Sequence, residues 1–386
     1  MTLRQLREED LSTVVAQASA SFGRTLDEHL RSTYRTRIAA GEVWGFEEDG
    51  TVLGHCRLLD AQHWLGGRRV PCLDIAAVAV PPENRGRGVA SGMMRAAVSR
   101  GVAEGYGLSL LFPSTTKLYR RLGWDLAGSL TRYRVRARAV PSGGGPSLRV
   151  ADRESDWDGI RGCQEAFAAQ FSGPGVRGEA RWEDLAQAPH RYVLDADEPG
   201  QVEAYVLVEH RPISGSWQHV LRVSDWAATT SRGLAALASF VGSHGTFARD
   251  VELLDSAPPR WAGLLPEQDL QTAGGLYWMA RGLDLPTAIA HRGFPAGLVV
   301  TVTLSVADDL APSGPWRLEV ADQRGQLTQS PDAEVELEPS AVGPLVTGFR
   351  SASELARLGS LQGPAAAIAK LDSAFAGPPP VMFDFF

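Results

Sequence analysis

The residues best suited to chemistry follow the apolar segment 71–80, in the stretch VAVPPENRGRGVASGMMRAAVSRG. Pro81-Pro82 ends the expected strand, because proline cannot continue a hydrogen-bonded ladder. Gly86 and Gly88 allow a tight turn and the close approach of a ligand to the backbone. The residues that follow present free N–H groups at the start of a helix, which is a common phosphate-binding arrangement. We therefore expect a pyrophosphate site formed by Arg85, Gly86, Arg87, Gly88, Val89 and Ala90.

This turn has two other possible interpretations. It could be an ordinary connection with two solvated arginines. It could also be a dinucleotide-binding loop, but its glycine spacing differs from G-x-G-x-x-G and no Walker lysine follows. The order V-x-V-x-P-x-x-R-x-x-G-x-A resembles instead the motif of the GNAT acetyltransferases. This resemblance implies that the turn holds the pyrophosphate of acetyl-CoA. It also implies that the pantetheine arm and the acetyl carbonyl meet the backbone of Val78, Ala79 and Val80.

A second chemically suited residue follows the next expected strand, 108–112, in the stretch PSTTKLYRRLGWDLAG. Ser114 is expected to cap the helix that begins here and to lie among the coenzyme-binding residues. Tyr119 comes further along this helix. Acetyl transfer to an amine expels a thiolate, and a tyrosine hydroxyl can supply the proton that it needs. Tyr119 could instead simply pack against the core. GNAT enzymes carry their general acid in the same Y-x-R-x-G-aromatic setting, so the resemblance implies that Tyr119 is the acid.

The composition is that of a globular protein and excludes several classes of function. The chain has 386 residues, 44% of them apolar, with a mean hydropathy of −0.12 and a formal net charge of −7. A nucleic-acid partner is not expected of such an acidic chain. Cys56, Cys72 and Cys163 include no CxxC pair, which argues against a disulfide framework and against a zinc site, so no metal is expected. No apolar run could span a membrane and the first residues do not resemble a signal peptide. We therefore expect a cytoplasmic protein with no membrane partner.

Two changes in composition divide the chain into three parts. The first is the linker PSGGGPS at residues 141–147, and the second lies near ARGLDLP at residues 280–286. These changes predict three domains, at residues 1–145, 146–285 and 286–386.

The first two parts share a weak internal repeat. Leu3-Arg4 followed by REEDL at residues 7–11 resembles Leu148-Arg149 followed by RESDW at residues 153–157. Both parts open with a short strand, an acidic turn that could cap a helix, and an amphipathic helix. The repeat predicts a duplicated unit. The second copy lacks the R-x-x-G-x-A turn, so we expect it to bind no CoA.

The third part has a different pattern, and it resembles the sterol-carrier-protein-like fold. A helix at LPTAIAHRGF precedes strands at GLVVTVTLSV, WRLEV and AEVELEPS and helices at SASELARLGSL and PAAAIAKLDSAFA. The expected fold class is α/β (α+β), with two tandem GNAT domains, the second degenerate, followed by a sterol-carrier-protein-like α+β domain. This arrangement resembles the Eis (enhanced intracellular survival) acetyltransferases along essentially the whole chain. The resemblance implies acetyl-CoA-dependent N-acetylation of primary amines, namely aminoglycosides, polyamines or lysine side chains, by direct attack in a ternary complex. It also implies a homo-hexamer.

The chain ends in PPPVMFDFF, whereas most soluble proteins end in polar residues. The segment could be a tail docked on the core, or an apolar end that mediates assembly. The Eis resemblance implies that the terminus lies in the first domain's active site and that the α-carboxylate of Phe386 is the general base. A terminal carboxylate is ionised near neutral pH and can accept the proton of an amine. Asp384 is an alternative group for holding or deprotonating the amine.

The acceptor pocket is expected from the same resemblance to include Phe22, Arg24 and Tyr34. Arg24 stands where an acidic residue would attract a polyamine, although Asp27 or Glu28 could compensate for it. His63 and His291 are expected to be surface or capping histidines without a role.

Two non-enzymatic functions remain as alternatives. One is a protein that binds a hydrophobic ligand through its third domain, and the other is a CoA sensor with a non-catalytic GNAT domain. The intact R-x-x-G-x-A turn together with Tyr119 favours the acetyltransferase.

Overall fold

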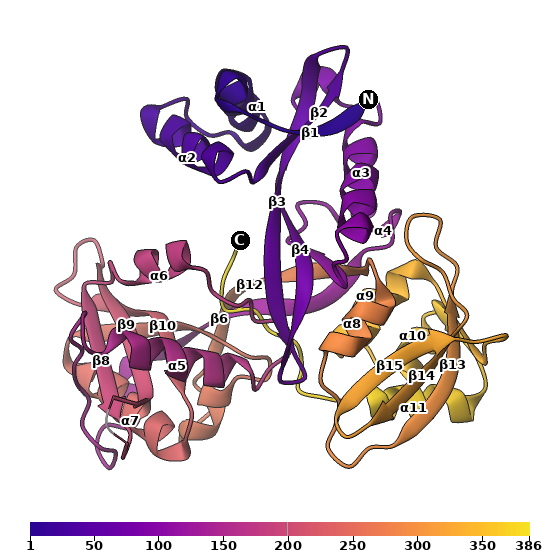
Figure 1. Cartoon of the computed structure of the whole chain (residues 1–386). Coiled ribbons are helices and arrows are strands. Elements are labelled where there is room, and N and C mark those ends of the chain that lie inside the picture. The colour runs from indigo at the N-terminus through magenta and orange to yellow at the C-terminus, as the bar shows by residue number, and fades with distance from the viewer. Residues whose placement is uncertain (199) are drawn as a thin grey trace.

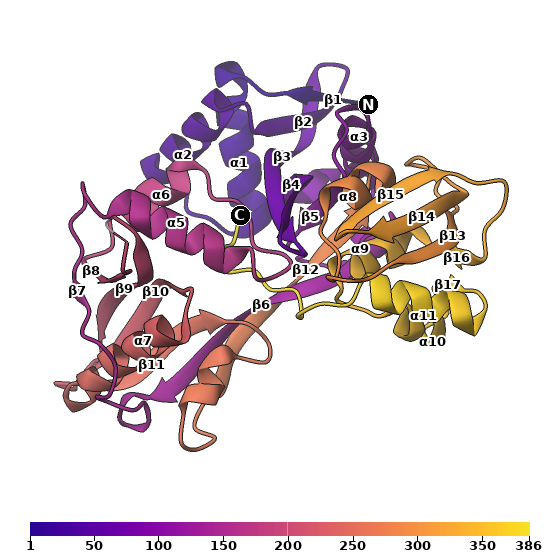
Figure 2. The ribbon, with the colours of Figure 1, turned by 60° about the horizontal axis from the view of Figure 1, so that its bottom comes forward.

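The computed structural model describes residues 1–198 and 200–386 and shows three units around the β3–β4 hairpin (Figures 1 and 2). The first unit contains α1 (Leu11–Phe22), α2 (Glu28–Ala39), α3 (Val89–Ala103), α4 (Thr116–Arg120), β1 (Thr2–Gln5), β2 (Val43–Glu48), β3 (Thr51–Leu65), β4 (Arg68–Ala79), β5 (Leu108–Leu111) and β6 (Asp125–Arg136). The second contains α5 (Trp157–Ala168), α6 (Glu179–Leu185), α7 (Ser231–Ser243), β7 (Arg149–Val150), β8 (His190–Asp195), β9 (Val202–Pro212), β10 (His219–Ala228), β11 (Ala248–Asp255) and β12 (Gln271–Gly282). The third contains α8 (Leu285–His291), α9 (Pro339–Thr347), α10 (Ala352–Arg357), α11 (Ala365–Ala374), β13 (Val300–Val306), β14 (Trp316–Ala321), β15 (Arg324–Gln329), β16 (Val335–Leu337) and β17 (Leu361–Gln362).

The first two units share one twelve-stranded sheet, in the order β1-β2-β3-β4-β5-β12-β6-β11-β10-β9-β8-β7. The last strand of the second unit, β12, lies between β5 and β6 of the first, and its partner β6 also pairs with β11. Each unit therefore completes the sheet of the other. The division at residues 145 and 285 stays a prediction, because the sheet itself does not break between the first two units.

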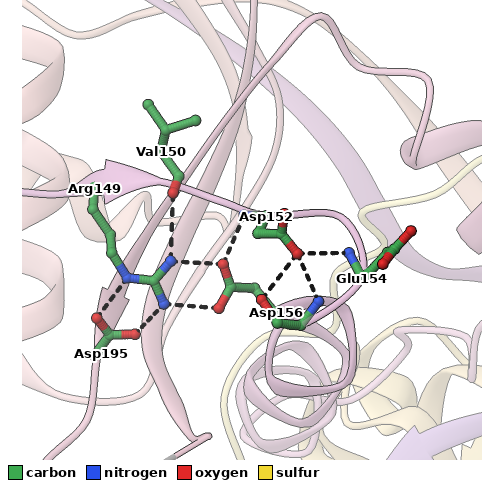
Figure 3. A network of polar contacts seen from close by, with 7 residues as sticks. Arg149, Val150, Asp152, Glu154, Asp156 and Asp195 are labelled. Atoms are coloured by element: carbon green, nitrogen blue, oxygen red, sulfur yellow. Dashed lines mark hydrogen bonds and ion pairs between the residues drawn. The ribbon is translucent and has the colours of Figure 1, made fainter.

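A three-residue ionic network fixes the first helix of the second unit (Figure 3). Arg149 on β7 donates to both oxygens of Asp156, at 2.6 and 2.7 Å, and its Nε donates to Asp195 at 2.7 Å. Asp156 is the N-cap of α5 and also accepts from the backbone N–H of Asp152 at 2.7 Å. The arginine therefore holds the helix start against the edge strand.

The first unit contains a corresponding network. Arg4 on β1 donates to both oxygens of Asp10, at 2.8 and 2.9 Å, and its Nε donates to Glu47 at 2.6 Å. Asp10 is the N-cap of α1 and accepts from the backbone N–H of Arg7 at 2.9 Å. The weak sequence repeat thus corresponds to the same contacts in both units, which is a structural sign of duplication.

The third unit has its own five-stranded sheet, in the order β15-β14-β13-β16-β17. This unit packs against the twelve-stranded sheet through one apolar cluster that includes Leu110, Trp278, Val302 and Leu345. Among the described residues, no helix combines the length and the apolar character that crossing a bilayer requires.

Candidate active site

Strands β4 and β5 part at one end of the first unit. Their parallel pairing runs from Cys72 opposite Leu108 to Ile75 opposite Leu111, which is the last residue of β5. Strand β4 continues to Ala79 and pairs there only with β3 among the strands described. Beyond Ile75 the edge of β4 that faced β5 has lost its partner strand. A backbone edge of this kind can donate to and accept from a bound molecule.

A β-bulge lies on β4 within this opening. The register jumps from Ala76 opposite Arg57 to Ala79 opposite His55, so Ala77 and Val78 face a single residue of β3. Ala77 has a φ of 49°, a left-handed conformation that is costly for a residue with a Cβ. Bulges often reorient backbone groups beside active sites. The predicted coenzyme contacts at Val78, Ala79 and Val80 therefore begin within the bulge and lead directly to the phosphate turn.

The predicted anion site has the backbone conformation that the motif requires. Gly86 and Gly88 have φ values of 76° and 78°, and no atom of the described residues lies within 4 Å of a Cβ added at either position. Gly88 is the N-cap of α3, and its carbonyl accepts the first helical hydrogen bond, from Gly92 at 2.9 Å. The N–H groups of the first helical turn thus have no helical acceptor and point outwards at the positive end of the helix dipole.

The side chains of the turn hold it against the sheet. Asn84 donates to the Leu53 carbonyl on β3 at 2.9 Å, and Arg85 donates to the Val80 carbonyl at 3.2 Å. Arg87 donates to Asn84 and to Glu48, each at 3.2 Å, and is exposed. The exposed arginines leave positive charge around an open, glycine-lined cradle, which fits a pyrophosphate.

Tyr119 is buried on α4 and packs edge-to-face against Trp124, with ring centroids 6.2 Å apart. Burial raises the pKa of Tyr119 to about 12, and the neighbouring Cys56 contributes in the same direction. No hydrogen bond within the described residues contributes to this shift. The hydroxyl is therefore protonated near neutral pH and free to donate to a ligand.

The N-cap of the helix that carries Tyr119 lies one residue later than the expected cap. Its N-cap is Thr115, and Ser114 is exposed in the preceding bend, so the prediction that Ser114 caps the helix is wrong. Thr115 adopts the extended conformation of an N-cap with a φ of −150°. The expected contact between Ser114 and the coenzyme stays a prediction.

The C-terminal tail runs back into the centre of the molecule. Val381 pairs with Ser129 of β6 in a parallel bridge, and Met382 donates to the Ser129 carbonyl at 2.8 Å. On its other side Val381 donates to the Ser172 carbonyl of the second unit at 2.8 Å. Both ribbon views show the C-terminus between the first and second units (Figures 1 and 2). The tail is therefore an ordered part of the interface between these units.

Asp384 anchors this tail to the second unit. Its oxygens accept from Arg177 and Arg181, each at 2.8 Å, and Arg177 also pairs with the buried Asp225 at 2.7 Å. Burial alone would raise the pKa of Asp384, but the charges of the two arginines hold it below its usual value. An ionised carboxylate bound by two arginines is suited to holding the tail and poorly suited to taking a proton from an amine.

The last two rings of the tail lie at the β4–β5 opening. Phe385 and Phe386 both pack on Phe112, with ring centroids 4.6 and 5.3 Å apart. Phe112 directly follows the end of β5. The terminal residue is thus fixed beside the point where the two strands separate.

His63 is not a surface histidine, so this prediction is wrong. Its side chain is only 2% exposed and its ring lies 6.2 Å from that of Phe386. Nε2 lies 2.9 Å from Asp74 and Nδ1 lies 2.7 Å from the Gly173 carbonyl oxygen. Burial lowers the pKa of His63, but Asp74 and the hydrogen bonds outweigh it and raise the pKa overall. His291, by contrast, is exposed at the end of α8, as predicted.

The predicted acceptor residues differ in their exposure to solvent. Phe22 and Arg24 are exposed around the end of α1. Tyr34 is buried in the core between α1, α2 and β3, with its hydroxyl 3.4 Å from Nε2 of His55. Leu30, Tyr34 and Ile38 recur at four-residue intervals, so Tyr34 belongs to the inward face of α2.

Comparison with known proteins identifies relatives for all three units. Family models match residues 2–127 and 173–281 as acetyltransferase (GNAT) domains and residues 285–383 as a sterol carrier protein domain. The predicted fold class is thereby confirmed. No curated protein matches the chain significantly.

Solved structures match over the full length of the chain. A GCN5-related N-acetyltransferase from Kribbella flavida is 30% identical, with a TM-score of 0.86, and the match covers 100% of this chain and 98% of that one. A GCN5-related N-acetyltransferase from Anabaena variabilis is 23% identical, with a TM-score of 0.92 and full coverage of both chains. Eis1 from Mycobacterium abscessus is 20% identical, with a TM-score of 0.79 and full coverage of both chains, so the predicted Eis-like architecture is confirmed.

Proposed function

Because the chain belongs to the GCN5-related N-acetyltransferases, we propose that it moves the acetyl group of acetyl-CoA directly to a primary amine within a ternary complex. The observation that carries this proposal is the position of Phe386, whose ring packs on Phe112 where β4 and β5 part. The chain terminus thus stands beside the opening where the thioester of acetyl-CoA would lie.

The first unit holds the donor through backbone groups. The glycine turn and the N-terminus of α3 offer unpaired N–H groups to the pyrophosphate, and Arg85 and Arg87 add charge. The opened edge of β4, with the bulge at Ala77, offers further groups to the pantetheine arm and to the acetyl carbonyl. The second unit lacks this glycine turn in its sequence, so we assign one donor site to the chain.

Two groups move the protons, one at the attacking amine and the other at the departing thiolate. The α-carboxylate of Phe386 accepts a proton from the attacking amine, directly or through water, because its intrinsic pKa of about 3.5 keeps it ionised. Tyr119 gives its hydroxyl proton to the departing thiolate of CoA, since its pKa of about 12 keeps the hydroxyl protonated until charge develops on sulfur. The products are the N-acetylated amine and free CoA.

The alternative base, Asp384, is disfavoured by its environment. Arg177 and Arg181 lower its pKa and occupy its oxygens. We assign it to anchoring the tail, so that the carboxylate two residues later is held at a constant position.

The acceptor is a small molecule or side chain with a primary amine, of the aminoglycoside, polyamine or lysine type. Phe22 and Arg24 stand exposed at the end of α1, and Asp27 and Glu28 follow at the start of α2. The mixed charges of this exposed segment favour acceptors that carry polar groups of both kinds over a long, purely cationic polyamine.

We also propose that the enzyme is a cytoplasmic homo-hexamer. In support of an assembly, the first half of β12 is exposed, and Leu276 and Tyr277 there are 51% and 56% exposed. Successive side chains of a strand face opposite sides of the sheet, so each face of this exposed strand end offers one large apolar side chain to a partner subunit. Light scattering coupled to size-exclusion chromatography measures the mass of the assembly directly.

Thiol release from acetyl-CoA with a panel of primary amines tests the proposal. We expect turnover with at least one amine, and a loss of roughly 10²- to 10⁴-fold in kcat for Tyr119→Phe with unchanged acetyl-CoA affinity. A chain that ends at Phe383 should bind acetyl-CoA but turn it over poorly.

Binding measurements beside this assay separate the alternatives. Acetyl-CoA binding without turnover on any amine would favour a CoA sensor. A chain that binds neither acetyl-CoA nor CoA, but binds apolar ligands through its third unit, would favour the hydrophobic-ligand carrier.

A further inference from the structure

A cavity of about 360 Å³ lies where the three units meet. It includes neither the glycine turn nor Tyr119. Its walls come from the β3–β4 turn, the end of α5, the segment after α8, the end of α9 and the start of the tail. In Figure 1 the tip of the β3–β4 hairpin, the tail and α8 lie close together at this place.

A buried arginine forms part of the wall. Arg292 is only 2% exposed, although arginine is rarely buried without a charged partner. Its Nε donates to the Gly293 carbonyl at 3.1 Å and its Nη1 donates to the Val346 carbonyl at 2.7 Å. Its Nη2 donates to no acceptor in the part of the chain that the structure describes.

Two aromatic rings fix the plane of this guanidinium. The rings of Phe294 and Phe375 lie 4.7 and 4.6 Å from the guanidinium carbon, and both residues line the cavity. The side chain is therefore held in one orientation, with one donor edge left over. Preorganised donors of this kind bind an anion with little loss of side-chain entropy.

The charge of Arg292 has no counter-charge in the described structure. Burial lowers the pKa of Arg292 to about 9, and no carboxylate offsets this effect. A buried cation that is paired only with carbonyl groups is costly, and an anion beside its free edge would reduce the cost.

The rest of the wall determines what kind of anion fits. Apart from the exposed Gln170, it consists of apolar side chains, glycines and the buried hydroxyls of Ser172 and Thr347. One cation matches a singly charged group better than a phosphate. At about 30 Å³ per heavy atom, the volume of a liquid water, the cavity holds roughly twelve heavy atoms.

We propose that this cavity is a binding site for a small amphipathic carboxylate, with its carboxylate on the free edge of Arg292 and its apolar body among Phe171, Phe294 and Phe375. The site differs from the donor and acceptor sites and does not depend on acetyl transfer. Because residues 375–378 form one wall and lead into the tail, an occupant would contact the segment that carries Phe386 to the active site.

A purely structural role for Arg292 is the main alternative. The two carbonyl contacts join the segment after α8 to the end of α9, and such a clasp needs no ligand. The two roles differ in whether an added carboxylate binds, so binding decides between them.

The probe is sodium octanoate, which has ten heavy atoms, measured by calorimetry and by thermal shift on the full chain. We expect saturable binding that is about tenfold or more tighter than that of 1-octanol, since a hydrogen bond to a charged group supplies the difference. Inorganic phosphate should not compete at equal concentration, and acetyl-CoA should not displace octanoate.

Substitutions at the mouth of the cavity locate the site without disturbing Arg292. Ala376 is exposed and lines the cavity, so Ala376→Glu places a competing carboxylate there. Ala369 is exposed on α11 and does not line the cavity, so Ala369→Glu is the matched control. We expect Ala376→Glu to weaken octanoate binding about tenfold or more and Ala369→Glu to leave it unchanged.

Several results would overturn the proposal. These are equal binding of octanol and octanoate, competition by phosphate, displacement of octanoate by acetyl-CoA, and equal loss of binding in the two glutamate variants. Absence of octanoate binding would leave Arg292 as a structural clasp.

Discussion

His63 and Asp74 form an ion pair in the interior of the protein. The ring nitrogen Nε2 lies 2.9 Å from the carboxylate, and Nδ1 lies 2.7 Å from a carbonyl oxygen of the second unit. Carboxylate and carbonyl oxygens only accept hydrogen bonds, so both ring nitrogens carry protons and the ring is an imidazolium. This charged pair on β3 and β4 joins the two GNAT units beside the terminal ring of Phe386.

We predict that His63→Gln destabilises the protein in a pH-dependent way. The folded pKa of His63 is raised, so its contribution is fully present below the unfolded pKa of about 6.5 and is lost as pH rises through the folded pKa. Removing one partner of a buried pair costs about 3 kcal/mol or more. Denaturant unfolding at pH 6 and at pH 9 should show a larger gap between wild type and variant at pH 6.

The exposed histidine on α8 provides the control for this experiment. His291→Gln should change the unfolding free energy little at either pH, because the exposed His291 ring donates to a carbonyl of its own helix. An equal gap at both pH values for His63→Gln would show that the ring is neutral and that its role is packing alone.

His55 is a second buried histidine with the opposite dependence on pH. Its Nδ1 lies 2.9 Å from Oε1 of Gln17, and burial lowers its pKa to about 4. The unfolded chain takes up this proton as pH falls from about 6.5, so stability decreases towards pH 4, by about 3 kcal/mol if the full shift applies. His55→Gln should remove this part of the acid sensitivity. The measurement is the slope of the unfolding free energy against pH between 4 and 6.5. An unchanged slope in the variant would show that His55 is not the source of the acid sensitivity.

The position of the terminal carboxylate can be moved without deleting any residue. One glycine added after Phe386 shifts the carboxylate by about 3.3–3.6 Å and leaves Phe385 and Phe386 in the chain. We expect kcat to fall about tenfold or more, because a general base must lie within hydrogen-bonding reach of its proton. The affinity for acetyl-CoA, measured by calorimetry, should not change.

Substitution of the anchor separates holding the tail from taking the proton. Arg181→Met removes one of the partners of Asp384 but leaves both carboxylates in place. If Asp384 only anchors the tail, Asp384→Asn and Arg181→Met should lower kcat by similar factors. Both decreases should be smaller than the decrease caused by the added glycine. A collapse of kcat in Asp384→Asn alone, with normal turnover in the extended chain, would make Asp384 the base.

Local motifs explain which parts of the site the sequence predicts. The turn around Gly86 and Gly88 depends on contiguous residues. The two glycines indicate backbone positions with positive φ, and the helix that follows them indicates the free N–H groups. Tyr119 stands in the same continuous motif. These features need no knowledge of distant contacts.

Long-range contacts explain what the sequence did not predict. His63 is buried by Asp74, eleven residues away, and by Gly173, which comes from the second unit. Strands β6 and β12 pair although they lie far apart in the chain, and no local sequence pattern indicates this pairing. Tyr34 follows a helical period, but the sequence does not show that this face of α2 turns towards His55. His63 and Tyr34 are residues whose surroundings another unit or another layer supplies, whereas the cap expected at Ser114 differs from the observed one by a local shift of one residue.

Gly88 offers a test of the donor site with a matched control. Gly88 and Gly105 flank α3, have φ values of 78° and 79°, and have no atom within 4 Å of an added Cβ. Alanine at either position should therefore cost a similar free energy of unfolding, about 1 kcal/mol, from left-handed strain alone. Only Gly88→Ala places a methyl group at the helix N-terminus that would receive the pyrophosphate. We expect its Kd for CoA to rise about tenfold or more, because the Cβ keeps the phosphate from the backbone N–H groups, while Gly105→Ala binds CoA normally. Equal CoA affinities in the two variants would place the pyrophosphate elsewhere.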